Sequence, residues 1–407
     1  MNEVVYAVLL HGEHVGSLQH RGRFTKLVFD ADYWDRPHRM VLGRWFEDHP
    51  REQPHATNRV PAWFSNLLPE GRLRALIARE QEVSEHREME LLERIGRDLP
   101  GAVSVVPDPD QRVEAGFDDA LASPERDPAS ARGPRRASLA GMALKFSMSR
   151  QGDRLVVPAH DEDGDWILKT PDQSYPGLPA NELAVMSLAR RVGIDVPEAS
   201  LWDRDSVDDL GPGAWPSRET DAYAVRRFDR SPAGRVHIED FAQVLGRVGA
   251  EDGKYRSNVE TVLGLAYRGQ DHDSLQEAVR RTVFNLLVGN GDAHLKNWSL
   301  IYPDGRRARL SPAYDLVCTA AYPELPELLG LPFLGSQRLD EVGREHFERV
   351  EHHLGVGRED VRDVLDETVE SFRSVWEDHD APDRVRRWVD AHLESTTARL
   401  TRPAAAP

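Results

Sequence analysis

The stretch Gly289-Asn290-Gly291-Asp292-Ala293-His294-Leu295-Lys296-Asn297 places an aspartate five residues before an asparagine, and a second aspartate follows at Asp315. This order is typical of kinases, in which the first carboxylate orients the acceptor hydroxyl and the other two side chains bind the Mg²⁺ of ATP. A transferring phosphoryl group spreads negative charge over its oxygens, so the site needs metal ligands and a positioning base. Taken alone, the two segments also fit a plain turn and a strand end.

Length and composition indicate a globular, multidomain protein. A chain of 407 residues is long for a single core and predicts two or three domains. No apolar run is long enough to span a bilayer, and the first residues lack the basic start and cleavage site of a signal peptide. Cys318 is the single cysteine. These features predict a cytoplasmic location and no membrane association.

The charge balance bears on nucleic-acid binding. The formal net charge is −17, whereas a protein that binds duplex DNA on its own neutralises many phosphates with Lys and Arg. We therefore expect any association with DNA to occur through a partner.

Composition divides the chain into four predicted parts. Short apolar strands and a helix with its apolar residues at helical spacing predict a β-rich N-terminal subdomain over 1–106. Residues 107–135 are rich in Asp, Pro, Ala, Ser and Arg, which predicts a flexible linker. Residues 136–230 are predicted to form a lobe with the nucleotide loop, and residues 231–400 a helical lobe with the catalytic and metal loops.

The segment after the linker contains two candidate phosphate-binding features. Small residues around Gly141 lead into an alternating strand, so a turn there could bring backbone N–H groups and Lys145 to a nucleotide. The segment lacks a full glycine motif, and a plain hairpin is the alternative.

Lys169 ends the apolar strand Trp166–Lys169, and Glu182 lies on the helix that follows. In kinases, a strand lysine binds the α- and β-phosphates and a helix glutamate orients it; an edge-strand lysine and a first-turn glutamate are the structural alternatives.

The remaining patterns place a hinge and a long helix. Arg226-Arg227-Phe228 follows a strand at the position of a kinase hinge, although arginine clusters are also common on solvated faces. The apolar stripe from Leu275 to Leu287 predicts a buried helix that delivers Asp292, begins with a capping box at Ser274–Glu277 and ends at Gly289.

Seven segments, in this order, resemble the signature blocks of the HipA-type toxin kinases. They are Asn66–Gly71, Ser138–Lys145, Leu168-Lys169, Asn181-Glu182, Arg227–Arg230, Gly289–Asn297 and Pro312–Asp315. The resemblance covers nearly the whole chain. It implies an α+β, bilobal protein-kinase-like fold, with a β-rich N-lobe and a mainly helical C-lobe, preceded by a small β-rich subdomain. It also implies a serine/threonine kinase of a type II toxin–antitoxin pair that uses ATP and Mg²⁺.

The resemblance also assigns expected roles. Asp292 would be the catalytic base, Asn297 and Asp315 the metal ligands, and Ser138 a serine whose autophosphorylation inhibits the enzyme. Two neighbouring arginines, Arg135 and Arg136, could pair with that phosphate. The nucleotide-binding residues would be Ala140, Gly141, Met142, Ala143, Leu144, Lys145, Lys169, Arg226, Arg227, Phe228, His294 and Lys296.

The expected partners are a HipB-like helix-turn-helix antitoxin, operator DNA reached only through that antitoxin, and a protein substrate, which in this family is an aminoacyl-tRNA synthetase. Three departures from the family pattern bear on nucleotide affinity: Ala143 in place of a glutamine, Arg226 in place of an acidic hinge residue, and a long linker. Two other functions stay open, a small-molecule kinase of the aminoglycoside or choline type and a catalytically silent corepressor with a kinase fold.

Overall fold

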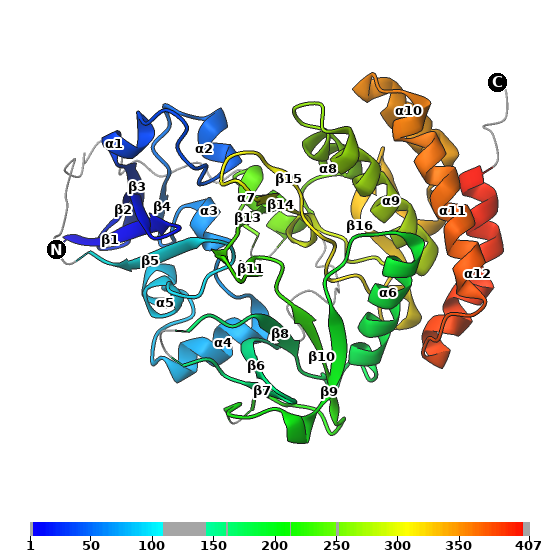
Figure 1. Ribbon diagram of the computed structural model, residues 1–407, viewed down its shortest axis with the longest axis horizontal. Helices are drawn as coiled ribbons and strands as arrows, with labels where there is room; N and C mark the ends of the chain where they lie inside the picture. The colour runs from blue at the N-terminus through cyan, green and yellow to red at the C-terminus, as the bar shows by residue number, and fades with distance from the viewer. Residues whose placement is uncertain (1–2, 109–143, 160–161, 212, 250–251, 402–407) are drawn as a thin grey trace. The chain divides into compact units, whose positions relative to one another are not determined.

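The computed structural model describes residues 3–108, 144–159, 162–211, 213–249 and 252–401 (Figure 1). The chain forms two compact units, each built from segments that are not continuous in sequence. Unit 1 combines Met1–Arg136 with Asp229–Lys254 and Ser299–Ala308, and unit 2 contains Ala137–Phe228, Tyr255–Trp298 and Arg309–Pro407. The boundaries of these two units differ from those of the four predicted parts, which stay a prediction.

Unit 1 contains a five-stranded antiparallel sheet with the strand order β4-β3-β2-β1-β5. Its inward side chains, among them Val8, Leu10 and Leu18, have no exposed surface. The elements are β1 (Glu3–Leu10), β2 (Glu13–Arg21), β3 (Phe24–Phe29), α1 (Ala31–Trp34), α2 (Arg44–Asp48), β4 (His55–Thr57), α3 (Ala62–Ser65), α4 (Gly71–Glu80), α5 (Glu88–Ile95) and β5 (Val103–Pro107). The region contains the strands and helices that the sequence predicts, and two of its strands, β4 and β5, follow helices in the chain.

Two later segments complete unit 1. They contribute β11 (Arg230–Ser231), β12 (Gly234–Arg235), β13 (His237–Asp240), α7 (Phe241–Val244) and β14 (Ser299–Tyr302), and β13 pairs antiparallel with β14. Glu239 of β13 is fully buried and accepts hydrogen bonds from Trp63 Nε1 (3.0 Å), the Arg44 N–H (2.8 Å) and the Tyr302 hydroxyl. One carboxylate thus joins three distant parts of the sequence.

Unit 2 begins with a second five-stranded antiparallel sheet, of order β7-β6-β8-β10-β9. Its strands are β6 (Lys145–Gln151), β7 (Arg154–Val156), β8 (Trp166–Lys169), β9 (Ala199–Asp203) and β10 (Asp221–Arg226), and the helix α6 (Leu178–Val192) lies between β8 and β9 in the chain. Met148, Trp166 and Leu168 are buried in its core. The β8 strand therefore carries Lys169 on a rigid, buried element.

The rest of unit 2 is mainly helical. It contains α8 (Val259–Ala266), α9 (His272–Val288), β15 (Arg309–Leu310), β16 (Leu328–Phe333), β17 (Ser336–Arg338), α10 (Arg344–Leu354), α11 (Arg362–Trp376) and α12 (Asp383–Thr401). Helix α11 packs against α9 and α6, and α12 packs against α9 (Figure 1). No helix in the described ranges is both long and apolar enough to cross a membrane.

Helix α9 confirms the predicted stripe but corrects its start. Leu275, Val279 and Val283 are fully buried, as the spacing predicts. The capping box predicted at Ser274–Glu277 is wrong, because the helix begins at His272 and Asp271 is its N-cap. The Asp271 side chain accepts from the Ser274 N–H (3.0 Å), and the Ser274 hydroxyl donates to Asp271 (2.7 Å). A carboxylate three residues earlier satisfies the free N–H groups of the first turn.

Candidate active site

The catalytic loop, residues 289–297, follows directly from the end of α9. Gly289 closes the helix in the left-handed region, with φ +69°. A Cβ atom at Gly289 would lie 2.5 Å from the Trp388 ring, and one at Gly291 would lie 2.4 Å from the Leu328 carbonyl oxygen. Both positions therefore need glycine, the first also because of its backbone conformation. The loop ends in a short 3-10 helix, Leu295–Asn297.

Hydrogen bonds within the loop fix the position of Asp292. Its N–H donates to Asn290 Oδ1 (3.1 Å), and its carbonyl oxygen accepts from the His294 N–H (2.8 Å) and from Asn297 Nδ2 (2.8 Å). Asp292 is buried, and its carboxylate accepts a hydrogen bond from the Tyr255 hydroxyl at 3.0 Å. The base and the metal-ligand asparagine of the predicted motif are thus held as one rigid piece.

Tyr255 is a site residue that sequence reasoning missed. It lies 37 positions before Asp292 and contacts both the Asp292 carboxylate and the His294 ring, whose centroid is 5.2 Å from its own. No local pattern marks it, because a tyrosine at the end of a short 3-10 helix, Gly253–Tyr255, has no periodicity that points to the loop. Only the folded chain brings the two segments together.

Asp315 is contacted by the two lysines of the neighbouring sheet. Lys145 of β6 and Lys169 of β8 are directly paired residues, and Lys145 Nζ lies 2.7 Å from Asp315 Oδ2 while Lys169 contacts Oδ1. Lys169 also forms an ion pair with Glu182 of α6. The structure therefore brings together four residues whose sequence positions span 170 residues.

The charges in this group stabilise one another. Burial alone lowers the pKa of Lys169, but the carboxylates of Asp315 and Glu182 outweigh it, so the pKa is raised. Burial raises the pKa of Asp315, and the two lysines outweigh that effect and bring it well below its usual range. Asp315 is thus an ionised carboxylate at neutral pH. Its backbone has φ +55°, which is uncommon for a residue with a side chain and persists where the surrounding structure fixes it.

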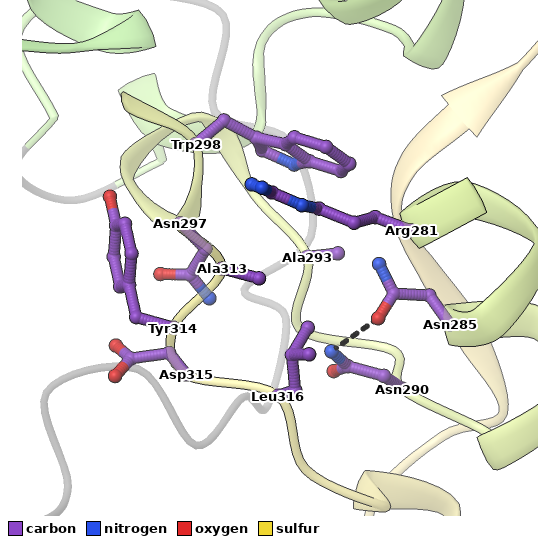
Figure 2. A pocket seen from close by; sticks show the side chains of 10 residues that line it. All are labelled: Arg281, Asn285, Asn290, Ala293, Asn297, Trp298, Ala313, Tyr314, Asp315 and Leu316. Carbon is purple, nitrogen blue, oxygen red and sulfur yellow. Dashed lines mark hydrogen bonds between the residues drawn. The ribbon is translucent and has the colours of Figure 1, made fainter. Parts of the chain in front are cut away.

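A pocket in unit 2 gathers the two predicted metal ligands (Figure 2). Its lining residues are Arg281, Asn285, Asn290, Ala293, Asn297, Trp298, Ala313, Tyr314, Asp315 and Leu316. Asn297 donates its amide N–H to Asp292, so its oxygen is the atom suited to a metal. An amide oxygen and a carboxylate fit Mg²⁺, which takes few protein ligands and fills its octahedron with phosphate oxygens and water.

The remaining predicted nucleotide residues lie at several places in unit 2. Arg227 is buried and donates to Ser147 Oγ (3.2 Å), whereas the Arg226 side chain is exposed. The Phe228 ring packs on Tyr314 at 5.6 Å between centroids. The Tyr314 hydroxyl in turn donates to the Lys296 carbonyl oxygen (2.9 Å).

At the nucleotide loop, the described residues begin with Leu144. Leu144 is buried, and its carbonyl oxygen accepts from the Thr170 N–H at 3.1 Å. Ser138 and the loop residues Ala140, Gly141, Met142 and Ala143 lie outside the described residues, so the roles expected for them stay predictions.

Comparison with known proteins decides the family. The HipA-like C-terminal domain model matches residues 137–376, and the HipA N-terminal domain model matches residues 6–106. The chain belongs to the HipA family. The family resemblance predicted from the seven sequence segments is confirmed.

Relatives of known name agree with this membership. Y4dM of Sinorhizobium fredii, whose name assigns it to the kinases, is 41% identical over 386 residues, which cover 92% of this chain and 91% of Y4dM. The serine/threonine-protein kinase toxin HipA of Shewanella oneidensis is 26% identical over 314 residues, covering 69% of this chain and 68% of the toxin. This HipA-family chain is therefore a member of a kinase family.

A solved structure shows the fold. HipA of Shewanella oneidensis MR-1, solved with HipB and operator DNA, superposes with a TM-score of 0.71 at 21% identity, over 97% of this chain and 96% of that one. The prediction of an α+β, protein-kinase-like fold is confirmed.

Proposed function

We propose that this chain is an ATP- and Mg²⁺-dependent serine/threonine protein kinase that acts as the toxin of a toxin–antitoxin pair. The observation that carries the proposal is the group formed by Lys169, Glu182 and Asp315. A buried lysine joined to a helix glutamate and to the metal aspartate is the arrangement that an active kinase needs for its nucleotide.

Each side chain has a role in this proposal. Asp292 orients the acceptor hydroxyl and takes its proton, held in place by the loop and by Tyr255. Asn297 and Asp315 hold Mg²⁺, and Lys169 binds the α- and β-phosphates. When bound, ATP would supply the phosphoryl group and Mg²⁺ would neutralise part of its charge. Because the protein's part is positioning and charge stabilisation, a rigid loop serves it well.

We further propose that the nucleotide contacts come from residues 140–145 and from Arg226, Arg227, Phe228, His294 and Lys296. The placement of Phe228 and Lys296 around Tyr314, beside Asp315, supports this assignment. Autophosphorylation of Ser138 would inhibit the enzyme, with Arg135 and Arg136 as partners for the phosphate.

The partners follow from relatives. The toxin name of Shewanella oneidensis HipA, and the presence of HipB and operator DNA in the solved structure of HipA from that organism, support a HipB-like antitoxin that links this chain to its operator. The family resemblance supports an aminoacyl-tRNA synthetase as the protein substrate, whose modification would arrest translation.

Asp292→Asn tests the central claim. The purified chain is incubated with labelled ATP and Mg²⁺, in separate reactions with a panel of purified aminoacyl-tRNA synthetases, with aminoglycosides and with choline. Phosphosites on the proteins are mapped by mass spectrometry. We expect transfer to a serine or threonine by the wild type, and a loss of roughly a thousandfold in Asp292→Asn at an unchanged melting temperature. Equal rates for the two proteins would contradict the role of Asp292. Transfer to an aminoglycoside or choline but to no protein would overturn the protein-kinase assignment.

A further inference from the structure

Asn181 makes a paired contact with a segment far along the chain. It lies on α6 directly before Glu182 and has no exposed surface. Its Nδ2 donates to the Cys318 carbonyl oxygen (3.0 Å), and its Oδ1 accepts from the Cys318 N–H (3.0 Å). One side-chain amide thus satisfies both backbone groups of a single residue 137 positions away.

Cys318 belongs to the metal segment, which we define as residues 315–319. The segment begins with Asp315 and ends with Thr319, whose hydroxyl accepts from the Gly291 N–H (2.7 Å) and donates to the Gly289 carbonyl oxygen (3.1 Å). The segment is therefore tied at Cys318 to the helix of Glu182 and at Thr319 to the catalytic loop. These are the elements that carry the proposed lysine partner and the proposed base.

We propose that Asn181 is a positioning residue of the kinase: its amide pair with Cys318 holds the metal segment in register with α6, so that Asp315 reaches Mg²⁺ and Lys169 together. This inference rests on the proposed function. Asp315 has a strained backbone, with φ +55°, and such a conformation persists only where the surrounding structure fixes it. The two hydrogen bonds at Cys318, three residues later, supply that constraint.

Two variants separate positioning from simple stability. Asn181→Leu keeps a similar volume and removes both hydrogen bonds. Asn181→Asp keeps the acceptor for the Cys318 N–H but replaces the donor with an oxygen that faces the Cys318 carbonyl oxygen, so we expect a change in the same direction. Thr368→Val is the matched control, because Thr368 of α11 is buried and its hydroxyl donates to the Val364 carbonyl oxygen within the same helix.

The first readout is the Mg²⁺ dependence of nucleotide binding and of phosphoryl transfer. Trinitrophenyl-ATP fluorescence and initial rates are each measured over a Mg²⁺ series, well below the melting temperature. We expect the half-saturating Mg²⁺ concentration to rise by about tenfold in Asn181→Leu, as for other residues that orient metal ligands. Thr368→Val should melt earlier than the wild type with the same Mg²⁺ dependence.

The second readout uses Cys318 and does not depend on activity. Cys318 is the single cysteine of the chain and has no exposed surface, and burial raises the pKa of its thiol to about 12. A thiol reagent such as Ellman's reagent should therefore modify the native wild type and Thr368→Val slowly. It should modify Asn181→Leu faster, because the metal segment opens more often once the amide pair is lost.

The outcomes distinguish the two claims. If the wild type transfers phosphate but neither Asn181 variant changes Mg²⁺ dependence or Cys318 reactivity, the positioning role is overturned. If the wild type transfers no phosphate, the proposed function fails, while trinitrophenyl-ATP binding and Cys318 reactivity still test the positioning role. Should Asn181→Leu not fold, Asn181→Asp carries the same test.

Discussion

Tyr255 shows how one hydroxyl can orient the carboxylate of Asp292, the proposed base. Its hydrogen bond occupies Oδ1 of Asp292. The second carboxylate oxygen can then be directed to the acceptor hydroxyl, and the carboxylate cannot rotate freely. A hydrogen bond to a charged group contributes about 1.5–3 kcal/mol, so its loss should be visible in the rate.

We expect Tyr255→Phe to lower kcat by roughly ten- to a hundredfold and to leave KM for ATP unchanged, since the hydroxyl contacts the base. Steady-state kinetics with the protein substrate would measure this split. Tyr33→Phe is the control, because it removes a buried hydroxyl that donates to the Met40 carbonyl oxygen (2.6 Å) in unit 1. A rise in KM for ATP with unchanged kcat would argue that Tyr255 serves the nucleotide instead.

At the scale of elements, the end of α9 decides where the catalytic loop begins. Gly289 and Gly193 both end helices in the left-handed conformation, with φ +69° and +93°. Only Gly289 has a ring where a Cβ atom would be, since nothing lies within 4 Å of the corresponding point at Gly193. The two glycines thus differ in crowding and share the same backbone requirement.

Gly289→Ala should therefore lower the free energy of unfolding by more than Gly193→Ala, for which backbone strain alone predicts about 1–2 kcal/mol. Gly289→Ala should also reduce phosphoryl transfer, because the Trp388 ring or the loop must move. Urea denaturation and initial rates of both variants would measure this. Equal losses of stability and full activity in both would show that the loop tolerates the extra carbon.

Strand β13 carries two buried groups with opposite pH effects. Burial raises the pKa of Glu239 to about 7, although hydrogen bonds from Tyr302, Trp63 and Arg44 act to lower it. Burial lowers the pKa of His237 to about 4. The folded state therefore holds an extra proton on Glu239 between about pH 4.5 and 7, and lacks one on His237 between about pH 4 and 6.5. As pH rises, loss of the extra proton on Glu239 lowers the free energy of unfolding. The titration of His237, which binds its proton more tightly in the unfolded chain, raises it.

Glu239→Gln should remove the fall in unfolding free energy with rising pH that Glu239 causes. Relative to this variant, the wild type should lose about 3 kcal/mol of unfolding free energy as pH rises from 4.5 to 7.5, and no more above that. The variant alone should gain stability between about pH 4 and 6.5 through His237. Urea titrations followed by tryptophan fluorescence at several pH values would measure both. A difference between the proteins that does not change with pH would show that Glu239 titrates normally.

Local sequence patterns predicted the buried face and the end of α9, and the strand that carries Lys169. The stripe of α9, the glycine at its end and the strand that ends in Lys169 each report burial or backbone conformation, which neighbouring residues determine. The contacts of Tyr255, Asn181 and Thr319 could not be predicted, because each joins segments whose separation in sequence carries no periodic signal. The predicted start of α9 was wrong because Asp271 and Ser274 are both suited to an N-cap, and the structure uses Asp271.

At the scale of the whole molecule, the charge of −17 constrains how the chain can reach DNA. We expect the isolated chain to leave operator DNA unshifted at about 0.15 M salt, and to join a complex with the DNA only when the proposed HipB-like antitoxin is present. Gel shifts over a salt series, with the antitoxin alone as control, would test this. Tight binding by the isolated chain with a steep salt dependence would reveal phosphate contacts of its own.

The discontinuity of unit 1 has a consequence for synthesis on the ribosome. The sheet β1–β5 is complete at Pro107, but Tyr302, which donates to Glu239, follows roughly 200 residues later. At about 5–20 residues per second, this interval lasts on the order of 10–40 s. Trp63 and the Arg44 N–H can bond to the Glu239 carboxylate only after roughly two thirds of this interval, and strand β13 obtains its partner β14 only at the end of it. Each translating ribosome therefore carries an incomplete N-terminal unit for about half of the time that the chain takes to make.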